Sequence, residues 1–315
     1  MPALDKREEQ EAALLLLDVH TEKQAALVSN RLLRAISEPL QVRERELVLT
    51  ASIGIALYPR DSSDVRILSR CAEQAVYSAK AAGRAQHRFF DETMNAQAKL
   101  RLSRETDLRR AIADNLLELH YQPIVNVAQG QITGVEALAR WRHPEHGMIP
   151  PGEFIPLAED SGLILPLTDW VLERACADLS RRLAAGLPAV PVSINLSSAS
   201  FSREGLPRQL DGLLSKYGLQ PGLLTLEVTE SLLMSDVDRA IARLNDLRQR
   251  GIRISLDDFG TGYSSLSYLK RFAVDELKID REFVHDVWRG GRDGAIAASI
   301  IALGREFGLL VLAVG

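Results

Sequence analysis

The pattern of apolar and polar residues changes after residue 115. From residue 116 onward, short segments with strand spacing recur along the chain, and they read LELHYQPIV, ITGVEALARW, AVPVSINLSS, LLTLEVTES, RISLDDFG, ELKID and GLLVLAVG. Helical apolar spacing fills most of the intervals between them, for example at 167–186 and 237–251. Repeated strand–helix units predict a parallel sheet that is either doubly wound or closed as a barrel.

Most of these strands have one apolar and one polar face, because successive side chains point to opposite sides of a strand. In LTLEVT (224–229), for example, Leu and Val alternate with Thr and Glu. The apolar faces can pack against covering helices, and the polar faces must then share one interior. Barrel interiors are normally apolar except near the C-terminal mouth, where active sites form. Five polar side chains are therefore expected to meet at one mouth: Glu136, Asn195, Glu227, Asp257 and Lys278.

The first 92 residues have a different pattern, which predicts a small α+β unit. The predicted elements are a buried strand at 13–17 (ALLLL), a helix at 19–40, a strand at 46–59, a helix at 63–83 and a short strand at 87–90. This is a low strand count for an independent domain, as if its N-terminal part were missing.

The boundaries of the second helix have clear sequence signals. Ser63 is a candidate N-cap for the helix, and Gly83 lies just past its end. Residues 92–115 are rich in Lys, Arg, Gln and Glu, which indicates a polar connecting helix. We therefore expect a first domain at 1–92, a helical linker at 93–104 and the strand–helix domain at 105–315.

Composition narrows the classes of partner. The net charge is −4 and the pI is near 5.9, so neither a nucleic acid polymer nor an anionic membrane is an expected partner. Cys71 and Cys176 are far apart and have no metal-like spacing, which favours a reducing compartment. No apolar run approaches the roughly 20 residues of a membrane helix, and the N-terminus does not resemble a signal peptide. A cytoplasmic protein is expected.

The expected mouth is rich in oxygen and negatively charged, with Asp258 next to Asp257 in sequence. Oxygen ligands select Mg²⁺ or Mn²⁺ rather than structural zinc. Two such ions about 3.5–4 Å apart suit in-line displacement at phosphorus, and Lys278 could hold the attacking water. Each residue alone has a plainer explanation: Glu136 as a solvated strand acid, Asn195 as a turn residue, the two aspartates as helix caps and Lys278 as an ion-pair partner.

The same segments resemble the EAL domains, a family of cyclic di-GMP phosphodiesterases. Glu136-Ala137-Leu138 resembles the motif that names the family. Further similar segments are YQPIV (121–125), PGEFIPLAEDSGLI (151–164), SINLSS (193–198), LEVTES (226–231), DDFGTGYSSLSYL (257–269) and LKIDREFV (277–284). The resemblance covers roughly residues 105–315. It implies a TIM-like (β/α) barrel that hydrolyses cyclic di-GMP to linear pGpG with two Mg²⁺ or Mn²⁺ ions.

The resemblance also implies roles for individual residues. The positions that match metal ligands are Glu136, Asn195, Glu227 and Asp257, with Asp258 as a ligand of the second ion, and the expected catalytic group is Glu136, Asp257 and Lys278. Gln122, Leu138 and Arg140 match the substrate-binding part of the family pattern. Glu230 matches the glutamate that anchors the loop after Asp258. The family likeness further implies a homodimer formed through the EAL domain.

The first 92 residues resemble the C-terminal half of a GGDEF domain, the cyclic di-GMP synthase module. ASIGIALYPRD (51–61) and AEQAVYSAKAAGRAQHRFF (72–90) show the likeness. Glu8-Glu9-Gln10-Glu11-Ala12 stands where the GGDEF motif is expected, and carboxylates there would repel a nucleotide phosphate. The domain is therefore expected to be degenerate, and the protein is not expected to be a diguanylate cyclase.

The last strand, GLLVLAVG, departs from the EAL pattern. Val314 stands where the family usually has a glutamate that works at the metal site, and an apolar side chain can neither bind a metal nor accept a proton. We expect a barrel that is incomplete at its C-terminus, without its last strand–helix unit, and an impaired enzyme. The alternative is an inactive module that binds cyclic di-GMP or a protein. A different barrel enzyme, such as a metal-dependent lyase, fits the ordered motifs poorly.

Overall fold

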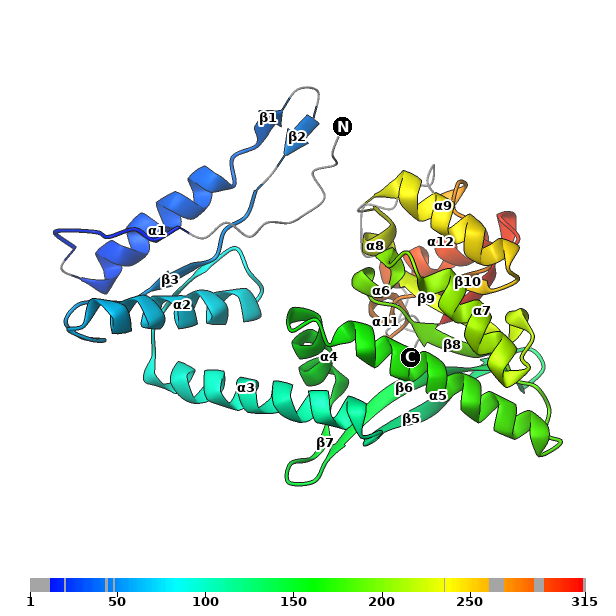
Figure 1. Cartoon of the computed structure of the whole chain (residues 1–315). Coiled ribbons are helices and arrows are strands. Elements are labelled where there is room, and N and C mark those ends of the chain that lie inside the picture. Colours follow the sequence, from blue (N-terminus) through cyan, green and yellow to red (C-terminus); the bar gives the residue numbers. More distant parts are fainter. Residues whose placement is uncertain are drawn as a thin grey trace. The chain divides into compact units, whose positions relative to one another are not determined.

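The structure is a computed structural model that describes residues 12–19, 21–42, 45–47, 49–234, 236–260, 269–285 and 292–313. The chain divides into two compact units, Met1–Ser103 and Arg104–Gly315 (Figure 1). In the described stretches, no helix is both long enough and apolar enough to span a bilayer.

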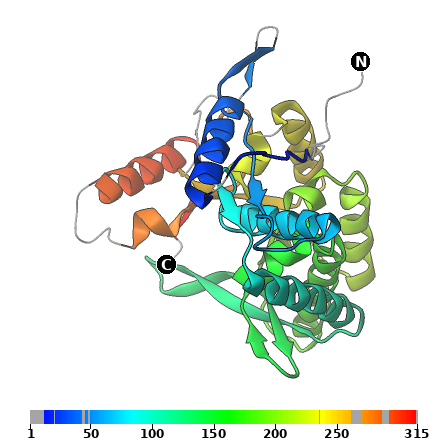
Figure 2. The same ribbon diagram turned by 90° about the vertical axis from the view of Figure 1, so that its left-hand side faces the viewer.

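The first unit is an α+β structure, as predicted. Its elements before the connecting helix are α1 (Glu22–Ile36), β1 (Leu40–Val42), β2 (Arg45–Leu47), β3 (Ile53–Ile55), α2 (Val65–Ala81) and β4 (His87–Phe89). Strands β1 and β2 form an antiparallel hairpin (Figure 2), whereas β3 and β4 pair in parallel. Helix α2 packs so closely on β3 that a Cβ atom at Gly54 would lie 2.0 Å from the carbonyl oxygen of Ala72.

Two expectations about the first unit are wrong. Residues 13–17 form no strand, and Leu15 and Leu17 are 86% and 76% exposed. Among the described strands β3 and β4 pair only with each other, so the leucine segment has no neighbouring strand to cover it. The N-cap of α2 is Asp64 rather than Ser63, because the Asp64 carboxylate accepts the backbone N–H groups of Arg66 and Ile67.

The polar segment 92–115 forms the predicted helix, α3 (Glu92–Ala113). Its C-terminal part belongs to the second unit, where Leu108 is fully buried in the core. Arg104 forms an ion pair with Glu153, and Asp107 lies 3.5 Å from the buried ring of His143. Buried and polar contacts therefore both fix the end of α3 on the second unit.

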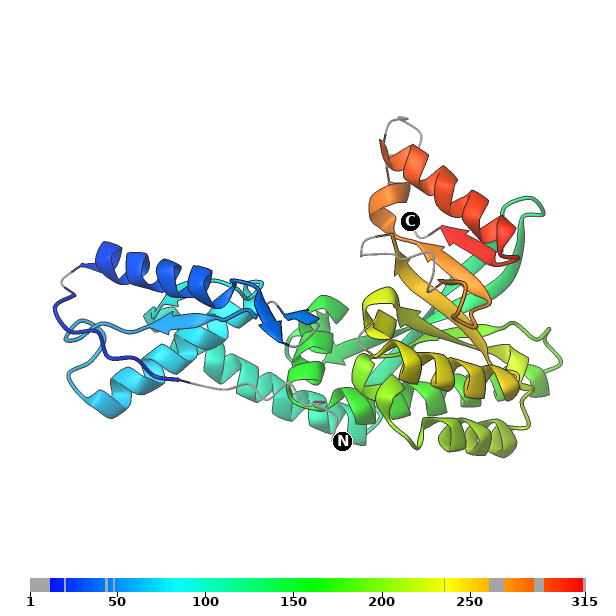
Figure 3. The same ribbon diagram turned by 90° about the horizontal axis from the view of Figure 1, so that it is seen from above.

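The second unit is a curled mixed sheet with helices (Figure 3). Its strands are β5 (Leu117–Asn126), β6 (Gln131–His143), β7 (Gly147–Ile149), β8 (Val192–Asn195), β9 (Leu224–Thr229), β10 (Arg253–Phe259), β11 (Glu276–Ile279) and β12 (Leu310–Ala313). The strand order is β12-β11-β10-β9-β8-β6-β5, with β7 paired to β6. In the part of the chain that the structure describes, β12 and β5 are the two ends of this order and do not pair with each other.

Two strand pairs, β5–β6 and β6–β7, are antiparallel and differ from the parallel sheet that the repeated units predict. Strands β6, β8, β9, β10, β11 and β12 are parallel, but β5 runs antiparallel to β6. Only a short turn separates β5 from β6, and a parallel connection needs a crossover of a dozen or more residues. The turn contains Gly130 with a φ of +64°, in the left-handed region that glycine tolerates.

Helices cover the apolar face of the sheet. They are α4 (Pro151–Asp160), α5 (Ile164–Ala184), α6 (Ser198–Ser202), α7 (Leu206–Tyr217), α8 (Glu230–Met234), α9 (Val237–Gln249), α11 (Arg281–Val284) and α12 (Arg292–Glu306), with a 3₁₀ turn at Pro221–Leu223. The helices expected at 167–186 and 237–251 are α5 and α9. The apolar strand residues, such as Ile194, Leu226 and Ile254, are fully buried in the core that these helices complete.

The opposite face of the sheet is polar and is partly buried. Its buried polar residues come from four adjacent strands: Ser193, Thr225, Glu227, Ser255, Glu276 and Lys278. The expectation that the polar strand faces share one interior is therefore confirmed for β8 to β11.

Candidate active site

Lys278 on β11 lies at the centre of a cluster of carboxylates. Its Nζ atom is 2.7 Å from Oε2 of Glu227, 3.2 Å from Oε2 of Glu136 and 3.2 Å from Oδ2 of Asp257. Asn195 joins the same group, because its Nδ2 donates to Oε1 of Glu136 at 2.8 Å. The structure therefore brings together the five side chains that the polar strand faces indicate.

The paired aspartates lie in a β-bulge. Leu256 pairs with Leu277 and Phe259 pairs with Ile279, so that Asp257 and Asp258 both lie opposite Lys278. Asp258 takes a left-handed backbone conformation with a φ of +56° and donates its N–H to Oδ1 of Asp257 at 2.9 Å. The extra residue brings two consecutive acids next to one lysine.

A glycine completes the turn after the bulge. Gly260 has a φ of +103°, and a Cβ atom there would lie 3.1 Å from Cε2 of Phe283 and 3.3 Å from Cδ1 of Ile300. Both the backbone angle and the space therefore favour glycine. The rest of the predicted loop, at 261–265, lies outside the described residues.

The register of the strands explains the remaining neighbours. Asn195 pairs with Glu227, and Glu227 pairs with Ser255 on the next strand. Glu136 on β6 is in register with Ser193, two residues before Asn195. Asn195, Asp257 and Lys278 thus lie near the C-terminal ends of their strands, the end that bears active sites in β/α sheets, and Glu227 lies beside Asn195. Glu136 lies in the middle of the longer strand β6.

Burial and neighbouring charges shift several pKa values. Burial, together with the negative charges of Glu136 and Asp257, raises the pKa of Glu227 to about 7, although Lys278 acts in the opposite direction. Burial alone would lower the pKa of Lys278, but Glu227 and Asp257 hold it above its ordinary value, so the amine stays charged. Burial and then Asp257 raise the pKa of Asp258.

The donor set of this cluster fits a hard divalent cation. Three carboxylates surround a single ammonium group, so one lysine does not balance their charge when all three are ionised. All the candidate ligands offer oxygen, which suits Mg²⁺ or Mn²⁺. Within the described ranges, no group of three or more Asp, Glu, His or Cys side chains has the geometry of an assembled metal site, and Lys278 lies between the carboxylates instead.

The three predicted substrate-binding residues lie along the β5–β6 pair. Gln122 is directly opposite Glu136, and both side chains therefore lie on the same face. Leu138 and Arg140 follow on β6 with the same parity and are partly buried. The Arg140 guanidinium donates to the carbonyl oxygen of Ala139 at 2.9 Å. These residues extend the polar face of the sheet away from Glu136.

Asp280 is a residue of this region that the sequence reasoning did not select. It hydrogen bonds with Asp258 and helps to raise its pKa, and its carboxylate accepts the N–H of Glu282 as the N-cap of α11. Its position two residues after Lys278, with the same strand parity, is the signal that could have identified it.

The described geometry does not test two further predictions. Glu230 is buried in the first turn of α8, but its expected role as a loop anchor involves residues 261–268, which lie outside the described residues. Val314, the residue that departs from the EAL pattern, also lies outside them.

A curled β/α sheet that brings acids, an amide and a lysine together on its inner face is typical of the TIM-like class of barrel enzymes. The family model for the EAL domain matches residues 105–315, and the chain belongs to the EAL domain family. The model described as "Diguanylate cyclase, GGDEF domain" matches residues 6–86, in agreement with the expected GGDEF-like first region.

Two curated relatives from Pseudomonas aeruginosa are similar over almost the whole chain. The bifunctional diguanylate cyclase/cyclic di-GMP phosphodiesterase MucR is 44% identical over 302 residues, which cover 96% of this chain and 44% of MucR. The cyclic di-GMP phosphodiesterase NbdA is 42% identical over 301 residues, which cover 96% of this chain and 38% of NbdA. The chain thus spans less than half the length of either relative.

Solved structures of EAL domains are also similar. A structure described as the PaMucR phosphodiesterase in complex with c-di-GMP has a TM-score of 0.64 and 46% identity, and the match covers 66% of this chain and 84% of that chain. The FimX EAL domain of Xanthomonas citri, in complex with c-diGMP, has a TM-score of 0.63 and 25% identity, covering 69% and 85%. The sequence-based fold class, an EAL-type TIM-like barrel with a GGDEF-like region before it, is confirmed.

Proposed function

We propose that this chain binds cyclic di-GMP and hydrolyses it to linear pGpG with the help of two Mg²⁺ or Mn²⁺ ions. The observation that supports this most directly is the contact of Lys278 with Glu136, Glu227 and Asp257. Those residues hold the positions that the EAL resemblance assigns to the catalytic centre, and relatives named as cyclic di-GMP phosphodiesterases are 42–44% identical to this chain.

Each residue of the cluster has a role in this proposal. Four residues hold the first ion, namely Glu136, Asn195, Glu227 and Asp257, and Asp258 holds the second. Bound ions of this kind activate water and stabilise phosphate oxygens. Lys278, which stays charged, donates hydrogen bonds to the attacking water and stabilises negative charge that develops on the phosphate.

The β5–β6 pair supplies the substrate contacts. The guanidinium of Arg140 suits a phosphate oxygen, because guanidinium groups form strong charge-assisted hydrogen bonds with phosphate. Gln122 can donate and accept hydrogen bonds, and Leu138 offers an apolar surface to a base. Their common face with Glu136 would hold a dinucleotide along the sheet while one phosphodiester lies at the ions.

A second candidate function is binding of cyclic di-GMP without turnover. Val314 favours it, because an apolar side chain occupies the sequence position where the EAL pattern has a metal-site glutamate. Binding of cyclic di-GMP with slow hydrolysis is intermediate between these two functions.

One experiment separates these functions. The purified chain is incubated with cyclic di-GMP and Mn²⁺ or Mg²⁺, while binding is followed by calorimetry and pGpG by chromatography. We expect pGpG formation that stops with EDTA and is abolished in E136Q. Binding without pGpG would establish the second candidate, and V314E, which restores a carboxylate, should then increase turnover. The homodimer implied by the family likeness remains a proposal, and sedimentation of the same sample tests it. The cytoplasmic location, expected from the cysteines and the apolar pattern, also remains a proposal.

A further inference from the structure

Two buried oxygen atoms beside the proposed metal centre lack a hydrogen-bond partner within the described residues. They are Oε1 of Glu227 and Oγ of Ser255. Glu227 is 1% exposed and Ser255 is fully buried, so bulk water does not satisfy either atom. Unpaired polar atoms at such depth are rare in proteins and call for an explanation.

The two residues are direct neighbours across strands β9 and β10. Ser255 is in register with Glu227, and neighbouring strands lie about 4.8 Å apart. Their side chains share the polar interior face of the sheet. Their chemistry is also complementary, because an ionised carboxylate only accepts hydrogen bonds while a serine hydroxyl has one proton to donate.

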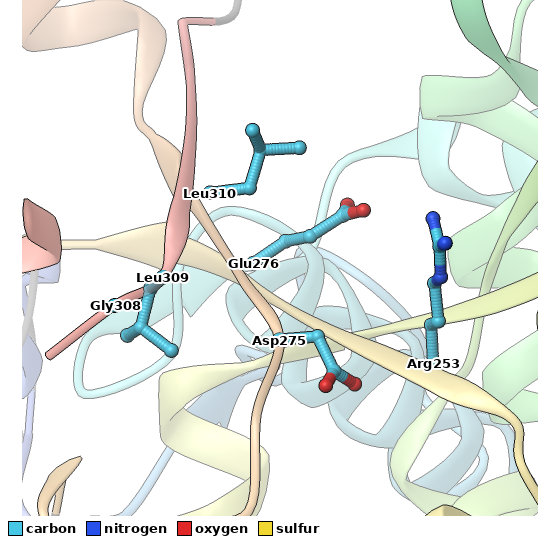
Figure 4. Close-up of a pocket in the computed structure, with 6 residues that line it drawn as sticks. All are labelled: Arg253, Asp275, Glu276, Gly308, Leu309 and Leu310. Atoms are coloured by element: carbon cyan, nitrogen blue, oxygen red, sulfur yellow. The ribbon is translucent and has the colours of Figure 1, made fainter.

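Ser255 has a second acidic neighbour, Glu276 on β11, with which it is also in register. The Glu276 carboxylate faces a cavity of about 410 Å³, which is also lined by Arg253, Asp275, Gly308, Leu309 and Leu310. Figure 4 shows this carboxylate directed toward the side on which Arg253 lies. Glu276 thus has an open cavity and the nearby Arg253, whereas Oε1 of Glu227 is a buried atom without a hydrogen-bond partner in the described residues.

We infer that Ser255 is a positioning residue for Glu227, and that its hydroxyl donates to Oε1, directly or through one buried water. This hydrogen bond fixes the carboxylate plane and keeps Oε2, which faces Lys278 at 2.7 Å, directed into the centre of the cluster. Partners behind a metal ligand set its orientation and its affinity for the ion. The inference rests on the proposed function, because it assumes that Glu227 is a metal ligand.

The test compares Mn²⁺ binding by the unsubstituted chain, S255A and S255T, measured by electron paramagnetic resonance without substrate. S255A should weaken Mn²⁺ binding by about tenfold, the lower end of effects seen for such partners. S255T keeps the hydroxyl and should restore most of the affinity. At saturating Mn²⁺, the KM of S255A for cyclic di-GMP should not change. The Mn²⁺ concentration that gives half-maximal activity should be higher for S255A than for the unsubstituted chain.

Two controls make the result specific. S200A removes another fully buried hydroxyl, which donates to Thr168 on a different part of the unit, and should lower the Tm without changing Mn²⁺ affinity. In an E227Q background, S255A should cause little further loss of Mn²⁺ binding, because the residue acts through Glu227. Additive effects of E227Q and S255A would overturn the inference.

The remaining outcomes distinguish the inference from the proposed function. S255A that binds Mn²⁺ as tightly as the unsubstituted chain overturns the inference alone. An unsubstituted chain that binds Mn²⁺ and loses affinity in S255A, but forms no pGpG, supports the inference and contradicts hydrolysis. A chain that binds no Mn²⁺ overturns both, since Glu227 then has no ion to hold.

Discussion

The ammonium of Lys278 lies 2.7 Å from Oε2 of Glu227, and both side chains are almost completely buried. The strength of this pair depends on the other charges around it. Glu136 and Asp257 are also ion-paired to Lys278, which makes this lysine the shared counter-ion of three acids from three different strands. Removal of a charge from such a cluster should be costly, and divalent ions should compensate for part of the cost.

Lys278 can therefore be tested by its removal. K278M leaves the acids without their shared cation, and breaking a buried pair typically costs about 3–5 kcal/mol in the free energy of unfolding. Hydrolysis of cyclic di-GMP should fall by about 10²–10³-fold, as for other lost electrostatic groups at reacting centres. Urea unfolding in metal-free buffer and product formation with Mn²⁺ measure the two effects.

The matched control for this variant is K216M. Lys216 forms an ion pair with Glu173, but at the surface, so its removal should leave stability and activity nearly unchanged. Mg²⁺ should raise the Tm of K278M more than that of the unsubstituted chain. Equal metal-free stability of K278M and the unsubstituted chain would show that Lys278 does not balance the three acids.

The raised pKa of Glu227 gives a prediction for stability against pH. The ordinary glutamate pKa is 4.5 and the folded value is about 7, so between these values the folded state binds more protons than the unfolded state. The contribution of Glu227 to the free energy of unfolding therefore falls as pH rises from 4.5 to 7 and stays low above pH 7. The limiting slope is about 1.4 kcal/mol per pH unit.

Urea unfolding of the metal-free chain between pH 5 and pH 8 measures this slope. E227Q should flatten it without abolishing it, because burial also raises the pKa values of Glu276 and Asp258. Mn²⁺ affinity should rise over the same interval, since a proton on Glu227 competes with the ion. A slope that is identical in E227Q would assign the pH dependence to other groups.

Strand alternation was sufficient to predict most of this site, because the side-chain period of two places Glu136, Asn195, Glu227 and Lys278 on one face without knowledge of the pairing. The bulge at Asp258 could not be predicted in this way. It depends on the register between β10 and β11, which are separate segments in sequence. The prediction of a buried strand at 13–17 was wrong for a related reason, because the burial of these leucines depends on a partner strand.

The left-handed backbone of Asp258 allows its conformation to be separated from its charge. D258N should keep the bulge, because Asn tolerates a positive φ, and should remove the negative charge proposed to hold the second ion. D258A should lose both the bulge and the negative charge, and a left-handed alanine should lower the free energy of unfolding by about a further 1–2 kcal/mol. We expect the unfolding midpoint of D258N to stay near that of the unsubstituted chain, while both variants lose most activity.

D258G provides the control for backbone strain, because glycine adopts a φ of +56° without cost. It should be inactive in hydrolysis but more stable than D258A. Full activity in D258G would exclude a metal-binding role for the Asp258 carboxylate, and equal stability of D258A and D258G would show that the left-handed conformation is not a constraint in solution.

Gly54 is the position where the first unit should be most sensitive to one added methyl group. In G54A the new Cβ would lie 2.0 Å from the oxygen of Ala72 and 2.3 Å from the nitrogen of Val76, and both are backbone atoms of α2 that cannot move alone. Overpacking of this kind costs about 1–3 kcal/mol or more. Hydrogen exchange read by mass spectrometry should show lost protection in α2 and β3, with unchanged protection in β9 and β10.

G152A is the control, because the added Cβ there has no non-neighbouring atom within 4 Å. Protection of α2 in G54A equal to that in G152A would contradict the close packing of α2 on Gly54.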